Sequence, residues 1–240
     1  MNYGYATLQS LSFTGTLGAK PAEKNLYLQF IGDSITCGLG NLCGKKEGGS
    51  CVNTANSHED SIEEDGTQTY AALAARAMNA DYEMISYSGI GTSYSWGKNF
   101  FEKDLYASAG TCRSASANFD FSTARIPSAV IVNLGTNDAS GYTNAGLTEE
   151  AHKAAVKELL LAIRANVGAD TPIVWAYGLM GTGKGDVIQA AITELDGESA
   201  KYYYFDGLTE QRNGGNGHPT VAGHEVAAQE LQTYLKRILA

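Results

Sequence analysis

Segments of two different periodicities follow one another along this chain. Five short segments are rich in apolar and β-forming residues, and the third is a nearly continuous apolar run of the kind found in buried parallel strands. These segments are residues 26–31, 82–86, 128–134, 171–177 and 202–205. Between them, apolar residues recur three and four positions apart, which predicts amphipathic helices. The predicted helices are residues 69–79, 148–167, 186–195 and 221–239.

The order of these segments predicts the architecture. Strands and helices alternate at least four times, which is typical of βαβ units whose parallel sheet is covered by helices on both faces. We therefore expect an α/β fold, a three-layer α/β/α sandwich with a parallel sheet of about five strands, over residues 26–240. Residues 5–18 alternate weakly, so residues 1–25 are interpreted as short N-terminal strands and a connector.

Two long stretches without clear periodicity interrupt the pattern. Residues 39–63 carry Gly-rich and acidic patches, and residues 97–124 are rich in aromatic, Ser and Ala residues. Loops of this length inside a domain usually serve function or lack order. Both follow predicted strands, so we expect them to shape a substrate cleft.

Composition and charge exclude several classes of protein. The chain has 240 residues, 43% hydrophobic and 18% charged, as expected of a globular domain. Its formal net charge of −9 leaves no basic stripe for nucleic acid. No run approaches the roughly 18 apolar residues of a membrane span. We therefore expect neither nucleic-acid nor membrane partners, whereas the oligomeric state stays open.

The N-terminus and the cysteines bear on the compartment. The first residues lack the basic and apolar regions of a signal peptide, so the protein is cytoplasmic or its start has been removed. The four cysteines have no metal-site spacing, and we expect no metal. Cys43 and Cys51 bracket a Gly-rich loop and would form a disulfide in a secreted protein or stay free in the cytoplasm. The other two cysteines are Cys37 and Cys112.

Residues able to do chemistry stand in loops at the ends of predicted elements. Three follow strands and the fourth precedes the last helix. They are Ser34, Gly89, Asn137 and His218. The carboxyl ends of parallel strands meet at one edge of an open α/β sheet, so we expect these four residues to converge.

Together the four residues supply what acyl transfer needs. Ser34 is the candidate nucleophile, and His218 is the candidate base that takes its proton. The Ser34 N–H, the Gly89 N–H and the Asn137 side-chain amide would donate to the oxyanion of a tetrahedral intermediate. Glycine suits position 89 because a Cβ there would obstruct the approach of the substrate.

The same residues resemble the motifs of a known superfamily. The SGNH (GDSL-type) hydrolases have four sequence blocks in this order, and the resemblance covers about residues 26–240. The matching segments are Gly32-Asp33-Ser34, Ser88-Gly89, Gly135-Thr136-Asn137-Asp138 and His218-Pro219. The resemblance implies a flavodoxin-like sandwich and a serine esterase without metal or organic cofactor.

A narrower resemblance concerns carbohydrate esterase family two. It rests on residues 30–38, Glu64-Asp65-Gly66 with Tyr70, residues 87–91 and residues 133–138. Those enzymes remove acetyl groups from plant polysaccharides such as xylan and glucomannan, which implies an acetylated carbohydrate as the partner and a secreted protein. They usually carry an N-terminal jelly-roll domain, of which residues 5–18 would be the last strands at most.

The chain departs from the superfamily pattern beside His218. An Asp usually stands three residues before the histidine and fixes its tautomer, but this position is Gly215. A backbone carbonyl of this loop, the Asn216 side chain, or a distant acid such as Asp206 would have to orient the imidazole instead. We favour the carbonyl, which gives a Ser–His dyad of lower activity than a full triad.

Other polar and aromatic residues have simpler interpretations. Asp33 and Asp138 suit helix caps, His224 suits a structural or surface place in the last helix, and His58 and His152 lie in polar, solvated stretches. Two tryptophans suit the core, although either could stack on a sugar ring. They are Trp96, after the Gly89 loop, and Trp175, at the end of a strand.

The sequence thus predicts an esterase that removes O-acetyl groups from carbohydrates of the xylan or mannan type. One alternative is a general short-chain esterase or lysophospholipase-like lipase. The other, motivated by the missing Asp, is a degenerate hydrolase that only binds carbohydrate.

Overall fold

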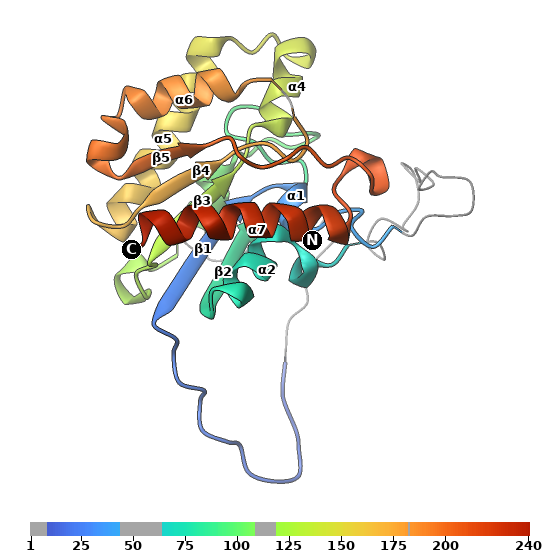
Figure 1. Cartoon of the computed structure of the whole chain (residues 1–240), viewed down its shortest axis with the longest axis vertical. Helices are drawn as coiled ribbons and strands as arrows, with labels where there is room; N and C mark the ends of the chain where they lie inside the picture. The colour runs from blue at the N-terminus through green and yellow to red at the C-terminus, as the bar shows by residue number, and fades with distance from the viewer. Residues whose placement is uncertain (1–8, 44–63, 109–118, 182) are drawn as a thin grey trace.

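A computed structural model describes the chain except for residues 1–8, 44–63, 109–118 and 182, and it has an α/β fold (Figure 1). The described strands form one sheet in the order β2-β1-β3-β4-β5, and each neighbouring pair is parallel. The strands are β1 (Leu26–Gly32), β2 (Ala80–Ser86), β3 (Ala129–Asn133), β4 (Ile173–Ala176) and β5 (Tyr202–Phe205). This order is that of flavodoxin-like folds, and the predicted parallel sheet is confirmed.

Helices cover both faces of the sheet. The α-helices are α1 (Ser34–Cys37), α2 (Tyr70–Ala77), α3 (Glu102–Ala107), α4 (Thr136–Asn144), α5 (Glu149–Val167), α6 (Gly185–Thr193) and α7 (Val221–Ile238). Short 3-10 turns are η2 (Gly66–Gln68), η3 (Phe121–Thr123), η4 (Gly197–Ala200) and η5 (Gly215–Gly217). Helices α2 and α7 lie side by side on the face turned to the viewer in Figure 1.

The core consists of two apolar layers, one on each face. On one face Phe30 and Ile131 pack among residues of α2 and α7. On the other, Val132 and Trp175 pack among residues of α3, α5 and α6. Side chains of successive strand residues point to opposite faces, so continuous apolar strands such as β3 fill both layers.

The register of the strands places three loops side by side. Gly32 at the end of β1 is opposite both Ser86 at the end of β2 and Asn133 at the end of β3. The three strands therefore end at the same level. The loops that follow them carry Ser34, Gly89 and Asn137.

Three segments differ from the sequence-based expectation. Residues 97–124, expected to be irregular, contain α3 and η3, and residues 136–144 form the unexpected α4. Residues 9–25 form no strand (Figure 1). Alternation alone does not make a strand there, because the backbone of an isolated extended segment has no ladder to pair with. Residues 5–8 lie outside the described part, and the boundary at residue 25 stays a prediction.

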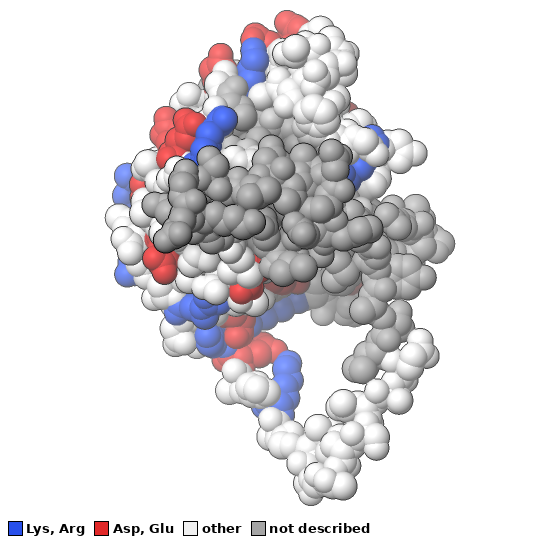
Figure 2. Space-filling view, turned by 90° about the vertical axis from the view of Figure 1, so that its right-hand side faces the viewer, with Lys and Arg blue, Asp and Glu red and all other residues white. Residues whose placement is uncertain are grey.

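Charged side chains of both signs are interspersed over the described surface in Figure 2. Several form exposed ion pairs, such as Lys103 with Glu158 at 2.6 Å. Among the described residues, no helix is long and apolar enough to cross a membrane.

Candidate active site

Ser34 and His218 meet at the carboxyl end of the sheet. The Ser34 Oγ lies 2.8 Å from the His218 Nε2, although the two residues are 184 positions apart. Both side chains are buried, with 6% and 8% of their surface exposed. At this distance the two atoms form a hydrogen bond, which is the arrangement that a serine nucleophile and its base require.

The turn before Ser34 gives it its position. Strand β1 ends at Gly32, where a Cβ would collide with the Thr36 side chain. Asp33 then caps α1, since its Oδ1 accepts from the Ile35 N–H at 2.9 Å. This cap is the role that the sequence predicts for Asp33. Ser34 is the first residue of α1, directly beyond the strand.

Asp33 is itself a polar group in the interior of the protein. Its side chain is fully buried. Burial raises the pKa of Asp33 to about 7, the Asp138 carboxylate adds to the rise, and the hydrogen bonds from Ile35 and Asn137 oppose it. Asp33 therefore exchanges its proton near neutral pH.

The imidazole of His218 faces two backbone carbonyls. Its Nδ1 lies 3.2 Å from the carbonyl oxygens of both Gly215 and Asn216. A carbonyl only accepts, so Nδ1 carries the proton and donates it. Nε2 is then unprotonated and accepts from the Ser34 hydroxyl. This is the arrangement of the carbonyl alternative, with Gly215 standing where the superfamily has its Asp.

The loop that carries His218 is attached to the loop after α1. The Gly215 N–H donates to the Gly40 carbonyl at 2.9 Å, and the Val221 N–H donates to that of Asn41 at 3.1 Å. Gly40 has a φ of +70°, and a Cβ there would meet the Gly215 backbone. Ser34 and His218 thus lie on segments that main-chain hydrogen bonds hold together. This role of Gly40 is not evident from the sequence, where its place shortly after the serine is the one signal for it.

Gly89 stands at a tight turn after β2. The Ile90 N–H donates to the Tyr87 carbonyl at 3.1 Å, and Gly89 has a φ of +81°. These features indicate a type II turn, whose third residue needs a positive φ. A Cβ at Gly89 would lie 2.9 Å from the Lys98 Nζ and 3.3 Å from the Trp96 Cβ. Glycine is thus required by the turn and by its neighbours, and not only by an approaching substrate.

The Asn137 side chain lines the same site but is already hydrogen-bonded. Its Nδ2 donates to the Asp33 Oδ2 at 3.0 Å and to the Ile90 carbonyl at 2.8 Å. These two bonds account for both hydrogens of the amide. Donation to an oxyanion therefore requires that one of them be redirected when substrate binds.

Asp138 holds the loop that follows Gly89. Its buried carboxylate accepts from the main-chain N–H groups of Thr92, Ser93 and Tyr94, at 3.0, 2.7 and 3.0 Å, and from the Ser93 hydroxyl at 2.8 Å. The residue at the N-cap of α4 is Gly135. Asp138 is therefore structural, but the prediction that it caps its own helix is wrong.

A cleft of about 870 Å³ opens above the serine and histidine. Its described lining includes Ser34, Gly89, Trp96, Lys98, Asn137, Ser140, Met180, Asn216 and His218. The volume lies within the range of small-molecule sites. Trp96 is half exposed in this cleft, where its ring is available to a ligand.

Trp175 does not reach the cleft. Its side chain is fully buried in the core, and its Nε1 donates to the Leu134 carbonyl at 3.0 Å. The interpretation of Trp175 as a core residue is therefore confirmed, and the alternative that it binds substrate is wrong. It stands at the end of β4, but its side chain points to the α5 and α6 layer.

The other histidines lie outside the cleft. His152 is buried and lies 3.1 Å from the Tyr142 hydroxyl, so the prediction that it is solvated is wrong. His224 Nδ1 accepts from the Tyr70 N–H at 3.1 Å, and burial, followed by the charge of His218, lowers the pKa of His224 to about 4. His58 lies outside the described residues.

The cysteines are described in part. Cys37 is a free, buried thiol and Cys43 takes part in a disulfide, whereas Cys51 and Cys112 lie outside the described residues. The pairing of Cys43 with Cys51 stays a prediction. In the described part of the chain, no three His, Cys, Asp or Glu side chains gather as metal ligands would.

The chain is similar to known esterases and acylhydrolases. The profile of the GDSL-like Lipase/Acylhydrolase family matches residues 30–226. The chain is 30% identical to the cellulase/esterase CelE of Acetivibrio thermocellus over 235 residues, which are 94% of this chain and 27% of that protein. The chain thus spans about a quarter of the length of this curated relative.

Two solved structures are also similar. A family two carbohydrate esterase from Clostridium thermocellum, in complex with cellohexaose, is 31% identical with a TM-score of 0.76, and the match covers 94% of this chain and 68% of that one. The acetyl xylan esterase Est2A from Butyrivibrio proteoclasticus is 26% identical with a TM-score of 0.77, and the match covers 94% and 67%. The similarity therefore extends over nearly all of this chain.

Proposed function

Because the chain belongs to the GDSL-like lipase/acylhydrolase family and is similar to family two carbohydrate esterases, we propose that it is a serine esterase that removes O-acetyl groups from carbohydrates. The observation that carries the proposal is the 2.8 Å contact between the Ser34 Oγ and the His218 Nε2 in an open cleft. The relatives named as acetyl xylan esterase and as a cellohexaose complex support the class of substrate.

The proposed reaction begins with attack by Ser34. As its Oγ bonds to the acetyl carbon, the Oγ proton passes to the His218 Nε2, and the carbonyl oxygen becomes an oxyanion. His218 then gives this proton to the sugar oxygen as the C–O bond breaks. The products of this half are the free hydroxyl of the carbohydrate and an acetyl-Ser34 ester.

Water completes the cycle. His218 takes a proton from the attacking water and a second tetrahedral intermediate forms. Its collapse returns the proton to the Ser34 Oγ and releases acetic acid, which ionises to acetate in water. The carbonyls of Gly215 and Asn216 hold Nδ1–H, so that Nε2 faces the serine in both halves. A neutral carbonyl stabilises imidazolium less than a carboxylate does, so moderate turnover is expected.

The oxyanion is proposed to rest on three donors. The Ser34 N–H lies at the start of α1 and the Gly89 N–H in the adjoining turn. The Asn137 amide, now donating to Asp33 and Ile90, is the third and would redirect one N–H to the intermediate. Losing one such donor costs about 10²–10³ in rate in other hydrolases.

The cleft itself favours a carbohydrate. Trp96 packs edge-to-face against Tyr94, with ring centroids 5.6 Å apart, and stays half exposed. We propose that its ring takes the apolar face of a sugar next to the acetylated one. Ser140, Asn216 and Lys98 line the same cleft and offer polar groups for hydroxyls.

The test is acetate release from acetylated xylo- and mannooligosaccharides, beside hydrolysis of an aryl acetate and an aryl octanoate. The proposal predicts acetate from the sugars and poor cleavage of the octanoate. Fast octanoate cleavage with untouched sugars would make the protein a lipid or general esterase. Sugar binding without any hydrolysis would make it a degenerate hydrolase that only binds carbohydrate.

A further inference from the structure

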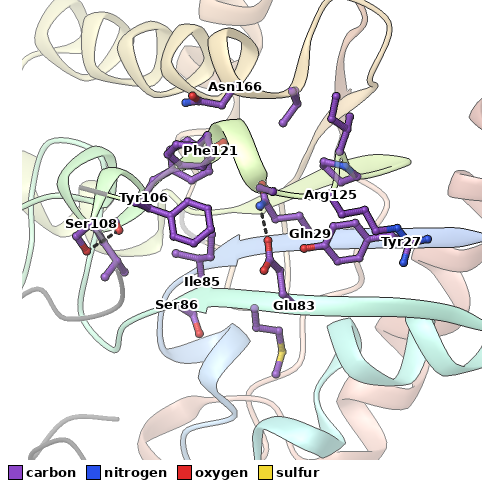
Figure 3. Close-up of a pocket in the computed structure, with 17 residues that line it drawn as sticks. Tyr27, Gln29, Glu83, Ile85, Ser86, Tyr106, Ser108, Phe121, Arg125 and Asn166 are labelled. Carbon is purple, nitrogen blue, oxygen red and sulfur yellow. Dashed lines mark hydrogen bonds between the residues drawn. The ribbon is translucent and has the colours of Figure 1, made fainter. Parts of the chain in front are cut away.

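A second cavity of about 460 Å³ lies on the face of the sheet that α3 and α5 cover (Figure 3). Residues of β1 and β2 form its floor, and α3, residues 119–127 and the end of α5 form its walls. Among the described residues, it shares no lining residue with the cleft above Ser34. Its volume is that of a small-molecule site, and the proposed esterase chemistry does not use it.

A polar atom at the floor of this second cavity lacks a hydrogen-bond partner. The Gln29 side chain is 6% exposed, and its Nε2 donates to the Glu83 carboxylate at 2.5 Å. The Gln29 Oε1 is buried and accepts no hydrogen bond. The Tyr106 hydroxyl, on a residue 2% exposed, has the Asn166 side chain beside it. Nearly all buried polar groups in folded proteins are hydrogen-bonded, so the Gln29 Oε1 indicates a place where a ligand completes the bonding.

Aromatic side chains flank these polar groups. In Figure 3 the Gln29–Glu83 pair lies between the Tyr106 ring on one side and the Tyr27 ring on the other. Tyr106 packs against Phe121 with ring centroids 5.0 Å apart. Burial, and after it the Glu83 carboxylate, raise the pKa of the Tyr27 hydroxyl, which agrees with the closeness of these two groups.

The cavity opens to solvent along its rim. Phe119 and Ile126 line it and are 43% and 61% exposed. A ligand entering there would pass apolar side chains and then meet the Gln29–Glu83 pair at the floor.

The charges and donors of the cavity restrict the ligand. Glu83 brings one negative charge, and the Arg125 guanidinium brings one positive charge, held by Asp81 at 2.8 Å and over the Tyr27 ring at 5.0 Å from its centroid. Asp81 already offsets the Arg125 charge, and the Gln29 amide donates to the Glu83 carboxylate, so the cavity presents hydrogen-bond acceptors to its ligand. The Gln29 Oε1 and the Glu83 carboxylate only accept, so the ligand must bring hydroxyl or amide donors.

A pyranose ring meets these requirements together. Its hydroxyls donate, and its C–H faces are apolar. An acyl chain brings no donor for the Gln29 Oε1, and an organic cation would meet the Arg125 guanidinium. We propose that this cavity is a second carbohydrate site, which binds one pyranose ring against Tyr27 and Phe121 with its hydroxyls on Gln29, Glu83 and Tyr106.

The test is a titration of the isotopically labelled protein with methyl β-D-xylopyranoside and methyl β-D-glucopyranoside, followed by NMR at the Gln29 side-chain amide. The proposal predicts a saturable shift with a Kd on the order of millimolar. Tyr106→Phe keeps the ring and removes only the hydroxyl, so the variant should fold as before and bind about 3- to 10-fold more weakly. Gln29→Leu, followed instead at the side-chain amide of Asn166 in the same cavity, should abolish the binding.

Two controls separate the cavity from the cleft above Ser34. Trp96→Ala should leave the titration at Gln29 unchanged, and Tyr106→Phe should leave hydrolysis of an aryl acetate unchanged. Because the glycosides carry no ester, the binding result is independent of the proposed esterase activity, and either proposal can fail without the other.

Three results would overturn the proposal. The first is no saturable shift at Gln29 with either glycoside up to about 100 mM, a concentration that would reveal even weak sites. The second is an unchanged Kd in Tyr106→Phe. The third is tighter binding of tetramethylammonium or phenol, used as matched cationic and aromatic probes, than of both glycosides.

Discussion

Replacing Asp33 with Asn tests the buried contact between the cap of α1 and the candidate oxyanion donor. The Asp33 carboxylate accepts from the Ile35 N–H with one oxygen and from the Asn137 amide with the other. An Asn side chain of nearly the same size has one oxygen and one NH₂ group. It therefore satisfies one of these donors and sets its own NH₂ group against the other.

The pH dependence gives the magnitude. Burial raises the pKa of Asp33 from 3.8 to about 7. Between these values the folded protein holds a proton that the unfolded chain has released, so stability falls as the pH rises through this window. At about 1.4 kcal/mol per pH unit, the loss reaches about 4 kcal/mol at pH 7 and above. Asn does not titrate, so the variant lacks this loss.

The assay is urea unfolding of both proteins at several pH values. The unfolding free energy of Asp33→Asn minus that of the unsubstituted protein should rise by about 3 kcal/mol from pH 4 to pH 7. The lost hydrogen bond shifts the whole curve and cancels in this slope. Asp170→Asn, the same substitution at an exposed position, controls for the change in net charge.

A difference that stays flat or falls with pH would refute the assignment of a raised pKa to a buried Asp33. Activity gives a second readout. Misplacing the Asn137 amide should lower kcat by up to about 10²–10³, the cost of one oxyanion donor. A kcat within about twofold of the unsubstituted protein would show that Asn137 does not depend on Asp33.

Three other substitutions test the loops around the site. Asp138→Ala leaves the N–H groups of residues 92–94 without their acceptor and should lower the unfolding free energy by at least about 3 kcal/mol. A loss below about 1 kcal/mol in urea titrations would disprove that Asp138 holds this loop. Trp96→Ala should raise the KM for acetylated oligosaccharides about 2- to 10-fold and leave aryl acetate kinetics unchanged, and an equal effect on both substrates would exclude the sugar platform. Gly89→Ala should lower the unfolding free energy by about 1 kcal/mol, because of the positive φ, and should also lower kcat. Gly97→Ala is the control, since it has the same backbone strain but no atom within 4 Å of its Cβ. An equal drop of kcat in both variants would contradict the role of the Gly89 turn.

The fold follows from local patterns in the sequence. Strands β1 and β3 are apolar runs buried on both faces, and α5 and α7 carry apolar stripes, so the hydrophobic effect acts on each segment much as its sequence indicates. Helix α4 was missed because residues 136–144 are polar and contain Gly141. There the Tyr94 side chain fills the space where a Cβ would lie, a contact between distant segments that no local pattern reveals.

The positions of the site residues can be predicted as far as the order of the strands and of the loops after them determines these positions. Ser34 and Asn137 follow strands whose ends lie level, so convergence could be expected. The roles of Asp138 and Trp175 depend on where their side chains point. Asp138 bonds to residues 44 to 46 positions earlier, and Trp175 turns into the core. The carbonyl contacts of His218 likewise depend on the backbone conformation around Asn216, whose φ of +52° is left-handed.

The measurement that tests the central claim most directly is acetate release from acetylated xylooligosaccharides by the unsubstituted protein and by Ser34→Ala. The two proteins are compared at equal concentration, and their melting temperatures are shown to match. The account predicts release by the former and loss of at least about 10³-fold in the variant, because the substitution removes the Oγ that lies 2.8 Å from the His218 Nε2 and forms the acyl-enzyme. Release that persists in Ser34→Ala would contradict the acetyl-Ser34 intermediate and the proposed mechanism with it.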